Sequence, residues 1–398
     1  MKILVFSQYF YPENFRINAL CRELVRRGHT VAVVTGYPQY PLGEIYEGYG
    51  FEIPYEPQWE GVHIQRVKVP PRGKGLVGML KNMVGYVLAA NHWVRKCTES
   101  YDAVYVFEVS PVTVGLPAVA YGKKFRVPVL FNLQDLWPEN VEEVLGIRFP
   151  PVIWTINRVV DHIYAGCHKI LCTSRGFVEN LRRRGVPEEK LRYWPQFCEE
   201  PLLEHVPRPD ELREENLNIV FAGNLGDAQG LDLLVRAARE LKGSPIRWYL
   251  VGDGRARVRL EQLVQELEVT EEVTFVGRVS TQEADRWVHY ADFAYLSFQD
   301  NKIFNMTIPA KLQTYLACGT PILAAAGGES VRLIRENGCG LVSRAELGEL
   351  VTTLKAAANL TAQEKQNMSE AARNCYLASF TMEKLVDELE EILAAAVE

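Results

Sequence analysis

The sequence predicts an α/β protein made of two doubly wound domains that face each other across a cleft. Short apolar runs, such as residues 1–7, 30–35 and 103–107, indicate strands buried on both faces. Helical patterns separate these runs, and strands that alternate with helices form parallel sheets. The 398 residues also exceed what one hydrophobic core usually holds. We therefore expect ligands near the carboxyl ends of the strands.

The first domain is predicted to span residues 1–195. Its strands are predicted at 1–7, 30–35, 103–107, 127–132 and 169–173, and its helices at 18–27, 113–125 and 176–184. Residues 196–216 contain three prolines among many charges and show little periodicity, which predicts a linker.

A second domain is predicted over residues 217–370. Its strands are predicted at 218–222, 247–251, 273–276, 293–297, 322–324 and 340–342, and its helices at 231–241, 257–267, 282–290 and 307–318. The rest, residues 371–398, predicts a C-terminal helix, for which packing back on the first domain is one arrangement.

Composition argues against several functional classes. The net charge of −6 disfavours a general nucleic-acid binder. Eight scattered cysteines, with no CxxC pair and no zinc spacing, are typical of free thiols in a reducing cytoplasm. Neither a signal peptide nor an apolar run long enough to span a bilayer is predicted. We expect a cytoplasmic protein.

Residues 304–321, FNMTIPAKLQTYLACGTP, are the most informative stretch. Thr307 is predicted to cap a helix that has Pro309 in its first turn. Lys311 and Thr314 would share the side opposite the apolar stripe. A helix that begins beside a cation favours an anion. The alternative is an ordinary helix with a surface lysine.

Glycine turns follow three predicted strands of the second domain, at Gly223, at Gly252, and at Gly277 with its neighbour Arg278. Small residues there let the backbone approach a phosphate, to which Asn224 and Gln229 could donate hydrogen bonds. Turns of this kind also need glycine for steric reasons alone. No complete GxGxxG opens either half, which argues against a dinucleotide oxidoreductase.

Several segments resemble a known family. FAGNLGDAQGLDLLVRAA, LVGDGRARVRLEQL, VTFVGRVS and TIPAKLQTYLACGTPILA, in this order, are similar to the donor half of family 4 glycosyltransferases of the GT-B fold. ILVFSQYFYPENFRINALCRELVRRGHTVAVVTGYPQYPLG and FNLQDLWPENVEEVLG resemble the bacterial branch that adds sugars such as N-acetylfucosamine in O-antigen or capsule assembly. The resemblance covers nearly the whole chain.

The resemblance implies transfer of a hexosyl or N-acetylhexosaminyl group from a UDP-linked sugar to a polyprenyl-diphosphate-linked saccharide. The nucleoside diphosphate would leave at the 304–321 helix, with its base and ribose near Gly277 and Arg278. The resemblance also implies metal independence, so Lys311 would supply the cation on the β-phosphate. Two other classes remain open: a related two-domain UDP-sugar epimerase and a non-catalytic sugar-binding protein.

The chain departs from the family pattern at four positions. Most members carry an Arg, a Lys and two glutamates where this chain has Asn224, Gln229, Met306 and Thr314. Recognition of the ribose would then fall to Thr314, Gln313 or Glu329.

Loops after the predicted strands of the first domain would face the acceptor. The candidates in these loops are Asn14, Arg16, Glu108 and Glu139. Arg16 could reach a phosphate or a sugar, or it could pair with the neighbouring Glu13.

Gln134 and Asp135 are the candidates beside the transferred sugar. Many family members have a histidine at the position of Gln134, and glutamine can hold a hydroxyl but cannot take a proton at neutral pH. Inverting transfer would need Asp135, Glu139 or Glu108 as a general base. Retention, which the resemblance implies, needs mainly stabilisation of the phosphate, and we predict it. Asp135 could instead be a turn residue ahead of Pro138.

Residues 70–96 interleave apolar side chains with basic ones and contain no acid. The basic residues are Arg72, Lys74, Lys81, Arg95 and Lys96. This pattern predicts an amphipathic helix that could lie on an anionic membrane, peripheral to the inner face of the plasma membrane. The alternative is a core helix with a solvated basic rim.

Overall fold

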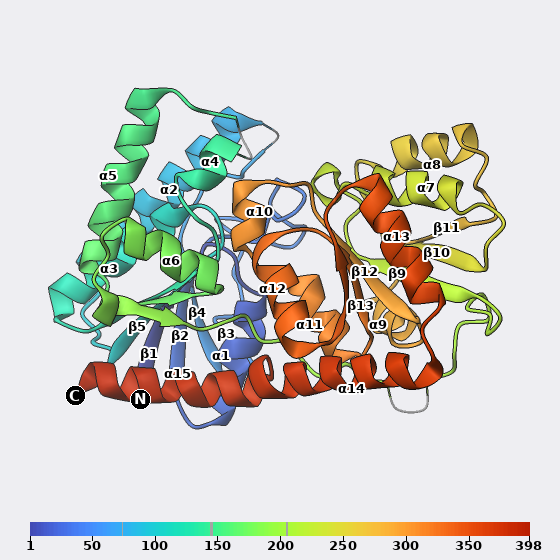
Figure 1. Ribbon diagram of the computed structural model, residues 1–398. Helices are drawn as coiled ribbons and strands as arrows, with labels where there is room; N and C mark the ends of the chain where they lie inside the picture. Colours follow the sequence, from blue (N-terminus) through green and yellow to red (C-terminus); the bar gives the residue numbers. More distant parts are fainter. Residues whose placement is uncertain (74, 144–145, 204–205) are drawn as a thin grey trace. The chain divides into compact units, whose positions relative to one another are not determined.

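The computed structural model describes residues 1–73, 75–143, 146–203 and 206–398. The chain divides into two compact α/β units (Figure 1). Unit 1 comprises Met1–Pro195 and Leu385–Glu398, and unit 2 comprises Gln196–Lys384. The segment 196–216, predicted as a linker, falls within unit 2, where Leu212 is buried in the core. Residues 204 and 205 of that segment lie outside the described residues.

The sheet of unit 1 has the strand order β3-β4-β2-β1-β5-β6-β7-β8. Its strands are β1 (Lys2–Phe6), β2 (Thr30–Thr35), β3 (Gln58–Trp59), β4 (Val62–Arg66), β5 (Ala103–Glu108), β6 (Val129–Leu133), β7 (Lys169–Cys172) and β8 (Leu191–Tyr193). Neighbouring strands are parallel except β3 with β4. Every residue of β5 and β6 is buried, as expected when helices cover both faces of a sheet.

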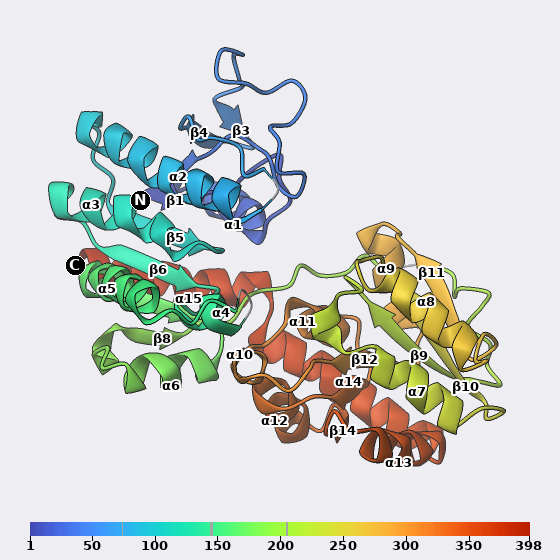
Figure 2. The ribbon, with the colours of Figure 1, turned by 90° about the horizontal axis from the view of Figure 1, so that it is seen from above.

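Helices of unit 1 pack on this sheet. They are α1 (Arg16–Arg26), α2 (Leu76–Lys96), α3 (Gly115–Phe125), α4 (Glu139–Glu143), α5 (Pro150–Gly166), α6 (Arg175–Arg183) and, from Leu385 onward, α15 (Met382–Val397). Helix α3 packs against both α2 and α5 (Figure 2). Trp194 Nε1 donates to the carbonyl oxygen of Leu385 at 2.9 Å, which ties α15 to the last strand of the sheet.

The sheet of unit 2 is entirely parallel, in the order β11-β10-β9-β12-β13-β14. Its strands are β9 (Leu217–Ala222), β10 (Ile246–Val251), β11 (Val273–Gly277), β12 (Phe293–Ser297), β13 (Ile322–Ala325) and β14 (Gly340–Ser343). Counted from β9, this is the Rossmann order 3-2-1-4-5-6. The direction of winding therefore reverses between β9 and β12, where ligands bind in such sheets.

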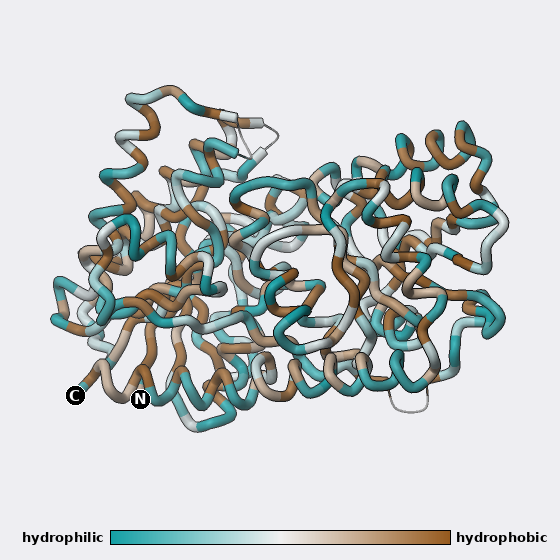
Figure 3. Tube along the Cα trace, viewed as in Figure 1, coloured by the Kyte–Doolittle hydropathy of each residue, from teal (hydrophilic) through white to brown (hydrophobic). Residues whose placement is uncertain are grey.

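Helices cover both faces of the second sheet. They are α7 (Asp232–Glu240), α8 (Arg257–Glu266), α9 (Thr281–His289), α10 (Lys302–Met306), α11 (Ala310–Ala317), α12 (Gly328–Asn337), α13 (Leu347–Ala358) and α14 (Ala362–Ser379). The core on one face joins side chains of α7, α8 and α13, and the core on the other joins side chains of α9, α11 and α14. Figure 3 shows hydrophobic residues running along the central strands between these layers.

The glycine turns that follow β9, β10 and β11 lie against one another. Gly223 N donates to Val251 O at 2.9 Å, and Gly252 N donates to Gly277 O at 2.8 Å. Gly252 has a φ of +135°, and a Cβ atom there would lie 2.0 Å from the carbonyl oxygen of Gly223. Only glycine fits such a contact, so the three turns form one continuous edge at the carboxyl ends of the strands.

Gly252→Ala should destabilise unit 2 by ~3 kcal/mol or more, because the backbone must move to relieve the clash with Gly223. Gly243→Ala is the matched control: Gly243 also has a positive φ, +81°, but a Cβ there meets nothing within 4 Å. The control should lose only about 1 kcal/mol. Urea unfolding measures both, and equal losses would contradict the close approach.

Candidate functional site

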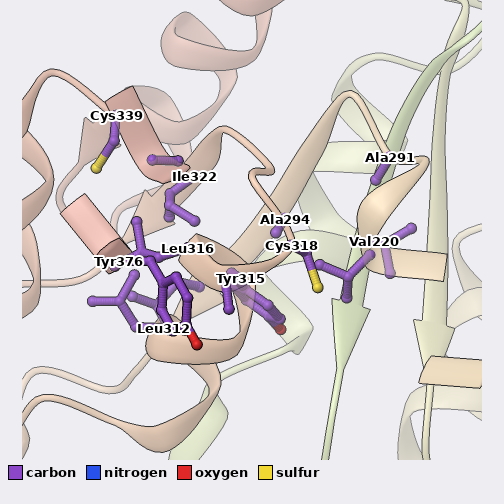
Figure 4. Close-up of a cluster of buried hydrophobic side chains, with 14 of the residues drawn as sticks. Val220, Ala291, Ala294, Leu312, Tyr315, Leu316, Cys318, Ile322, Cys339 and Tyr376 are labelled. Carbon is purple, nitrogen blue, oxygen red and sulfur yellow. The ribbon is translucent and has the colours of Figure 1, made fainter. Parts of the chain in front are cut away.

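Helix α11 is held firmly against the end of β9. Its apolar side, with Leu312, Tyr315 and Leu316, is buried beside Val220 and neighbouring strand residues (Figure 4). The Tyr315 hydroxyl donates to the carbonyl oxygen of Ala222 at 3.1 Å, and the backbone N–H of Ala222 donates to it at 3.0 Å. These contacts fix the rotation of the helix and so direct the Lys311 side chain toward the strand ends.

Lys311 is a partly buried cation with an apolar surround. Its Nζ lies 3.9 Å from the ring centre of Phe221 and donates to Oε1 of Gln229 at 2.9 Å. Among the residues that the structure describes, Lys311 forms no ion pair. Burial lowers the pKa of Lys311 to about 7. An ammonium group held this way lacks a counter-charge, which a phosphate would provide.

Gln229 connects the two strands at the reversal of winding. It ends the 3-10 turn Asp227–Gln229, which follows β9. The Ser297 hydroxyl, at the end of β12, donates to the backbone carbonyl oxygen of Gln229 at 2.6 Å. A Cβ atom on Gly223 would lie 3.5 Å from Lys311 Nζ. The structure thus brings together three of the predicted donor-site residues, Gly223, Gln229 and Lys311, at the place where this fold binds ligands.

The other predicted donor residues of the glycine turns lie along the same edge. Asn224 is exposed, and its amide lies against Gly226 and Gly254, within 2.7 Å of where a Cβ atom on each would be. Gly277 ends β11 with a φ of +88°, and Arg278 follows it with an exposed side chain. One strand, β10, lies between this turn and the end of β9, where Lys311 lies, and the role of Arg278 stays a prediction.

The prediction that Thr307 caps the 304–321 helix is wrong. The N-cap of α11 is Pro309, whose backbone is extended, and Thr307 instead ends α10. The Thr307 hydroxyl donates to the carbonyl oxygen of Ile303 at 2.9 Å. Extended residues between the two helices separate Thr307 from the first turn of α11, so its side chain cannot reach the free N–H groups there.

Thr314 follows Lys311 by three residues on α11 and is half-buried, so its place on the ligand side stays a prediction. Its hydroxyl lies 3.7 Å from the sulfur of Cys198 and 3.4 Å from the carbonyl oxygen of Ala310. The two alternatives for the ribose are also engaged elsewhere. Gln313 is wholly buried, and Glu329 pairs with Arg332 at 2.7 Å.

Glu108 lies at the end of β5 and has no exposed surface. Its Oε2 accepts hydrogen bonds from the backbone N–H groups of Gln134, at 3.0 Å, and Asp135, at 2.9 Å. Burial and the neighbouring Asp135 raise the pKa of Glu108 well above its usual value, and the two backbone hydrogen bonds oppose this shift. Glu108 therefore shapes the loop after β6, and its role toward the acceptor stays a prediction.

Asp135 connects the loops that follow β5 and β6. Its Oδ2 accepts from the Ser110 backbone N–H at 3.0 Å and from the Ser110 hydroxyl at 2.7 Å. Beside it, the Gln134 amide donates to the side-chain oxygen of Asn132. Glu139, in the first turn of α4, accepts from the Asn180 amide at 3.0 Å. Asp135 thus stabilises these two loops, and its catalytic role stays a prediction.

The loop after β1 is held by a buried carboxylate. Glu13 Oε1 accepts from the backbone N–H groups of Gln39, at 2.9 Å, and Tyr40, at 2.7 Å. Burial raises the pKa of Glu13, and these bonds oppose the shift. Glu13 thus joins the loops after β1 and β2. Asn14 beside it is exposed, and Arg16 is the first residue of α1.

The sequence analysis missed Phe221 and Ser297, which contact Lys311 and Gln229. An aromatic residue two positions before a strand-end glycine could have signalled the first. Among the described residues, no group of three or more His, Cys, Asp or Glu side chains is placed to hold a metal ion.

Comparisons with known proteins agree with this geometry. A model described as "Glycosyl transferase 4-like domain" matches residues 14–196, and one described as "Glycosyl transferases group 1" matches residues 216–359. The chain is 23% identical over 343 residues to a protein of Escherichia coli (strain K12) named as the colanic acid biosynthesis glycosyl transferase WcaI, over 80% of this chain and 82% of that protein.

Two solved structures show the same fold. Anabaena Alr3699/HepE, in complex with UDP, aligns with a TM-score of 0.70 at 15% identity, over 99% of this chain and 100% of that one. WaaG, described as a glycosyltransferase involved in lipopolysaccharide biosynthesis, aligns with a TM-score of 0.67 at 15% identity, over 99% of each chain. At such identities the likeness shows the fold alone, and the predicted fold class is confirmed.

Lys311→Met should raise the free energy of unfolding most at pH 7 and below. Below pH 7 both folded and unfolded wild type carry the Lys311 charge, and lowering the pKa from 10.5 to about 7 corresponds to a cost on the order of 5 kcal/mol. Above pH 7 the folded protein loses this proton before the unfolded chain does. The advantage of the variant should therefore shrink by about 1.4 kcal/mol per pH unit toward pH 10.

Urea unfolding of wild type and Lys311→Met between pH 6.5 and 9.5 measures this trend. Lys355→Met, at an exposed lysine on α13, controls for the substitution itself. A gap between wild type and Lys311→Met that stays constant with pH would rule out a lowered pKa for Lys311.

Proposed function

The chain belongs to the group 1 glycosyltransferases of the GT-B fold, and from that premise we propose that it transfers a sugar from a UDP-linked donor to a lipid-linked saccharide at the cytoplasmic face of the membrane. The product would enter a cell-surface polysaccharide. A relative named for colanic acid biosynthesis and a structural neighbour in complex with UDP support this proposal.

Lys311 is the observation that carries the proposal. When the bond between the sugar and the diphosphate breaks, negative charge accumulates on the β-phosphate. A fixed cation in a partly dry site stabilises that charge more in the transition state than in the ground state. Packing of α11 and the neutral partner Gln229 hold the Lys311 ammonium without satisfying its charge. The charge is thus available to a phosphate.

The protonation of Lys311 depends on whether the donor is bound. With a pKa of about 7, the group is only partly charged near neutral pH before the donor binds. A diphosphate within a few ångströms raises that pKa, because an opposite charge favours the ionised form. Binding of the donor thus charges the lysine that then stabilises the leaving group.

The acceptor-side geometry favours retention. Glu108 is buried, and Asp135 uses its carboxylate to join two loops. A general base would need a free carboxylate within reach of the acceptor hydroxyl. With these two residues engaged, and with Glu139 accepting from the Asn180 amide, we take the departing phosphate oxygen as the acceptor of that proton. We propose a retaining, metal-independent transfer on this basis.

Lys311→Ala should lower kcat by about 10²–10³-fold while it weakens binding of free UDP by less than about tenfold, since charge builds up fully only as the bond breaks. Steady-state kinetics with a UDP-sugar and calorimetric titration of UDP measure the two effects. Lys355→Ala, at the exposed α13 lysine, should change neither. An unchanged kcat for Lys311→Ala would overturn the assignment.

A further inference from the structure

Helix α2 turns an apolar face to solvent. Its exposed large apolar side chains are between 43% and 68% exposed, and they are Leu76, Val77, Leu80, Val84 and Leu88. Four of them recur every four residues, which places them along one side of the helix over about 18 Å. Elsewhere among the described helices, apolar rows of this length face a core. The exposed row on α2 therefore indicates a surface that binds a partner.

The opposite side of α2 is buried although it is partly polar. Asn82 donates to the carbonyl oxygen of Pro70 at 2.7 Å and accepts from the Gln8 amide at 2.6 Å. The Tyr86 hydroxyl donates to the carbonyl oxygen of Val34 at 2.9 Å. Buried polar groups of this kind would lose their partners if the helix turned. The hydrogen bonds therefore hold the apolar row outward.

Two close contacts also fix the rotation of the helix. A Cβ atom on Gly78 would lie 2.2 Å from the carbonyl oxygen of Arg72, and one on Gly85 would lie 2.5 Å from Cδ of Pro70. Glycine at these positions lets α2 press against the preceding loop. The outward row is thus a property of the folded unit, because hydrogen bonds and close glycine contacts hold the same orientation.

Basic side chains accompany the apolar row. Lys81 is exposed beside Leu80 and Val84, and Arg95 and Lys96 are exposed in the last turn. No acidic residue occurs between residues 70 and 96. Lys74, which belongs to the same basic set, lies outside the described residues. An apolar row with cations and no anions complements a surface that is apolar inside and negatively charged outside.

We infer that α2 lies in the headgroup region of an anionic bilayer, with Leu76, Leu80, Val84 and Leu88 in contact with the acyl chains. None of the described helices is long and apolar enough to cross a membrane, so α2 would bind parallel to the surface. Figure 2 shows α2 packed against α3 within unit 1. The inference rests on the proposed function in one respect, since a lipid-linked acceptor would lie in the same bilayer.

Flotation of the full chain with liposomes tests this docking surface. Wild type should float with vesicles of phosphatidylcholine and phosphatidylglycerol, and weakly with phosphatidylcholine alone. Leu80→Gln/Val84→Gln/Leu88→Gln should reduce the bound fraction at least tenfold, because it removes the apolar contacts from an already exposed face. Lys81→Glu should weaken binding to the anionic vesicles only.

A matched control comes from unit 2. Val258 on α8 and Leu377 on α14 are also exposed, at 65% and 49%, and Val258→Gln/Leu377→Gln should float like wild type. Wild type that stays unbound with both vesicle types, or a triple variant that binds normally, would overturn the inference. A lipid-free dimer that the triple variant dissociates would assign the row to a second copy of the chain instead.

The same variants separate this inference from the proposed function. With a water-soluble acceptor saccharide, the triple variant should transfer sugar at the wild-type rate, because α2 holds none of the donor-site residues. If wild type floats with liposomes but transfers no sugar, the proposed function is contradicted and the membrane-binding inference is supported. If wild type transfers sugar but does not float, the membrane-binding inference is contradicted and the proposed function is supported.

Discussion

The structure of the candidate site depends on one constraint, a lysine ammonium held in a partly dry environment without a counter-charge. Lys311 lies over the ring of Phe221, and its hydrogen-bond acceptor is the neutral amide of Gln229. Such a group is unfavourable in the folded protein unless an anion joins it. The cost is local and persists because α11 is packed along its whole apolar side.

The topology of unit 2 explains why this constraint falls where it does. The winding reverses between β9 and β12, so the loops after these strands diverge and leave room for a ligand. The hydrogen bond from the Ser297 hydroxyl to the Gln229 backbone connects the loops that follow these two neighbouring strands. The glycine turns after β9, β10 and β11 bring backbone close to the same edge of the sheet. The sheet therefore positions both the cation and a surface without bulky side chains.

The alternation of strands and helices, and the helix that carries Lys311, could be predicted from the sequence because both depend on local pattern. The N-cap of α11 could not be predicted, because a short helix, α10, precedes α11. Thr307 therefore ends α10, and Pro309 is the N-cap of α11. The short strands β3 and β8 were missed because two or three residues carry no periodicity. The burial of Glu108 depends on which loops meet, which no local pattern records.

Proton uptake on UDP binding tests the central claim most directly. Calorimetric titration at pH 8, in two buffers with different ionisation enthalpies, counts the protons that the complex gains. With a pKa of about 7 for free Lys311, binding of the diphosphate should take up close to one proton, and Lys311→Met should take up none. Equal proton uptake by wild type and the variant would contradict the account.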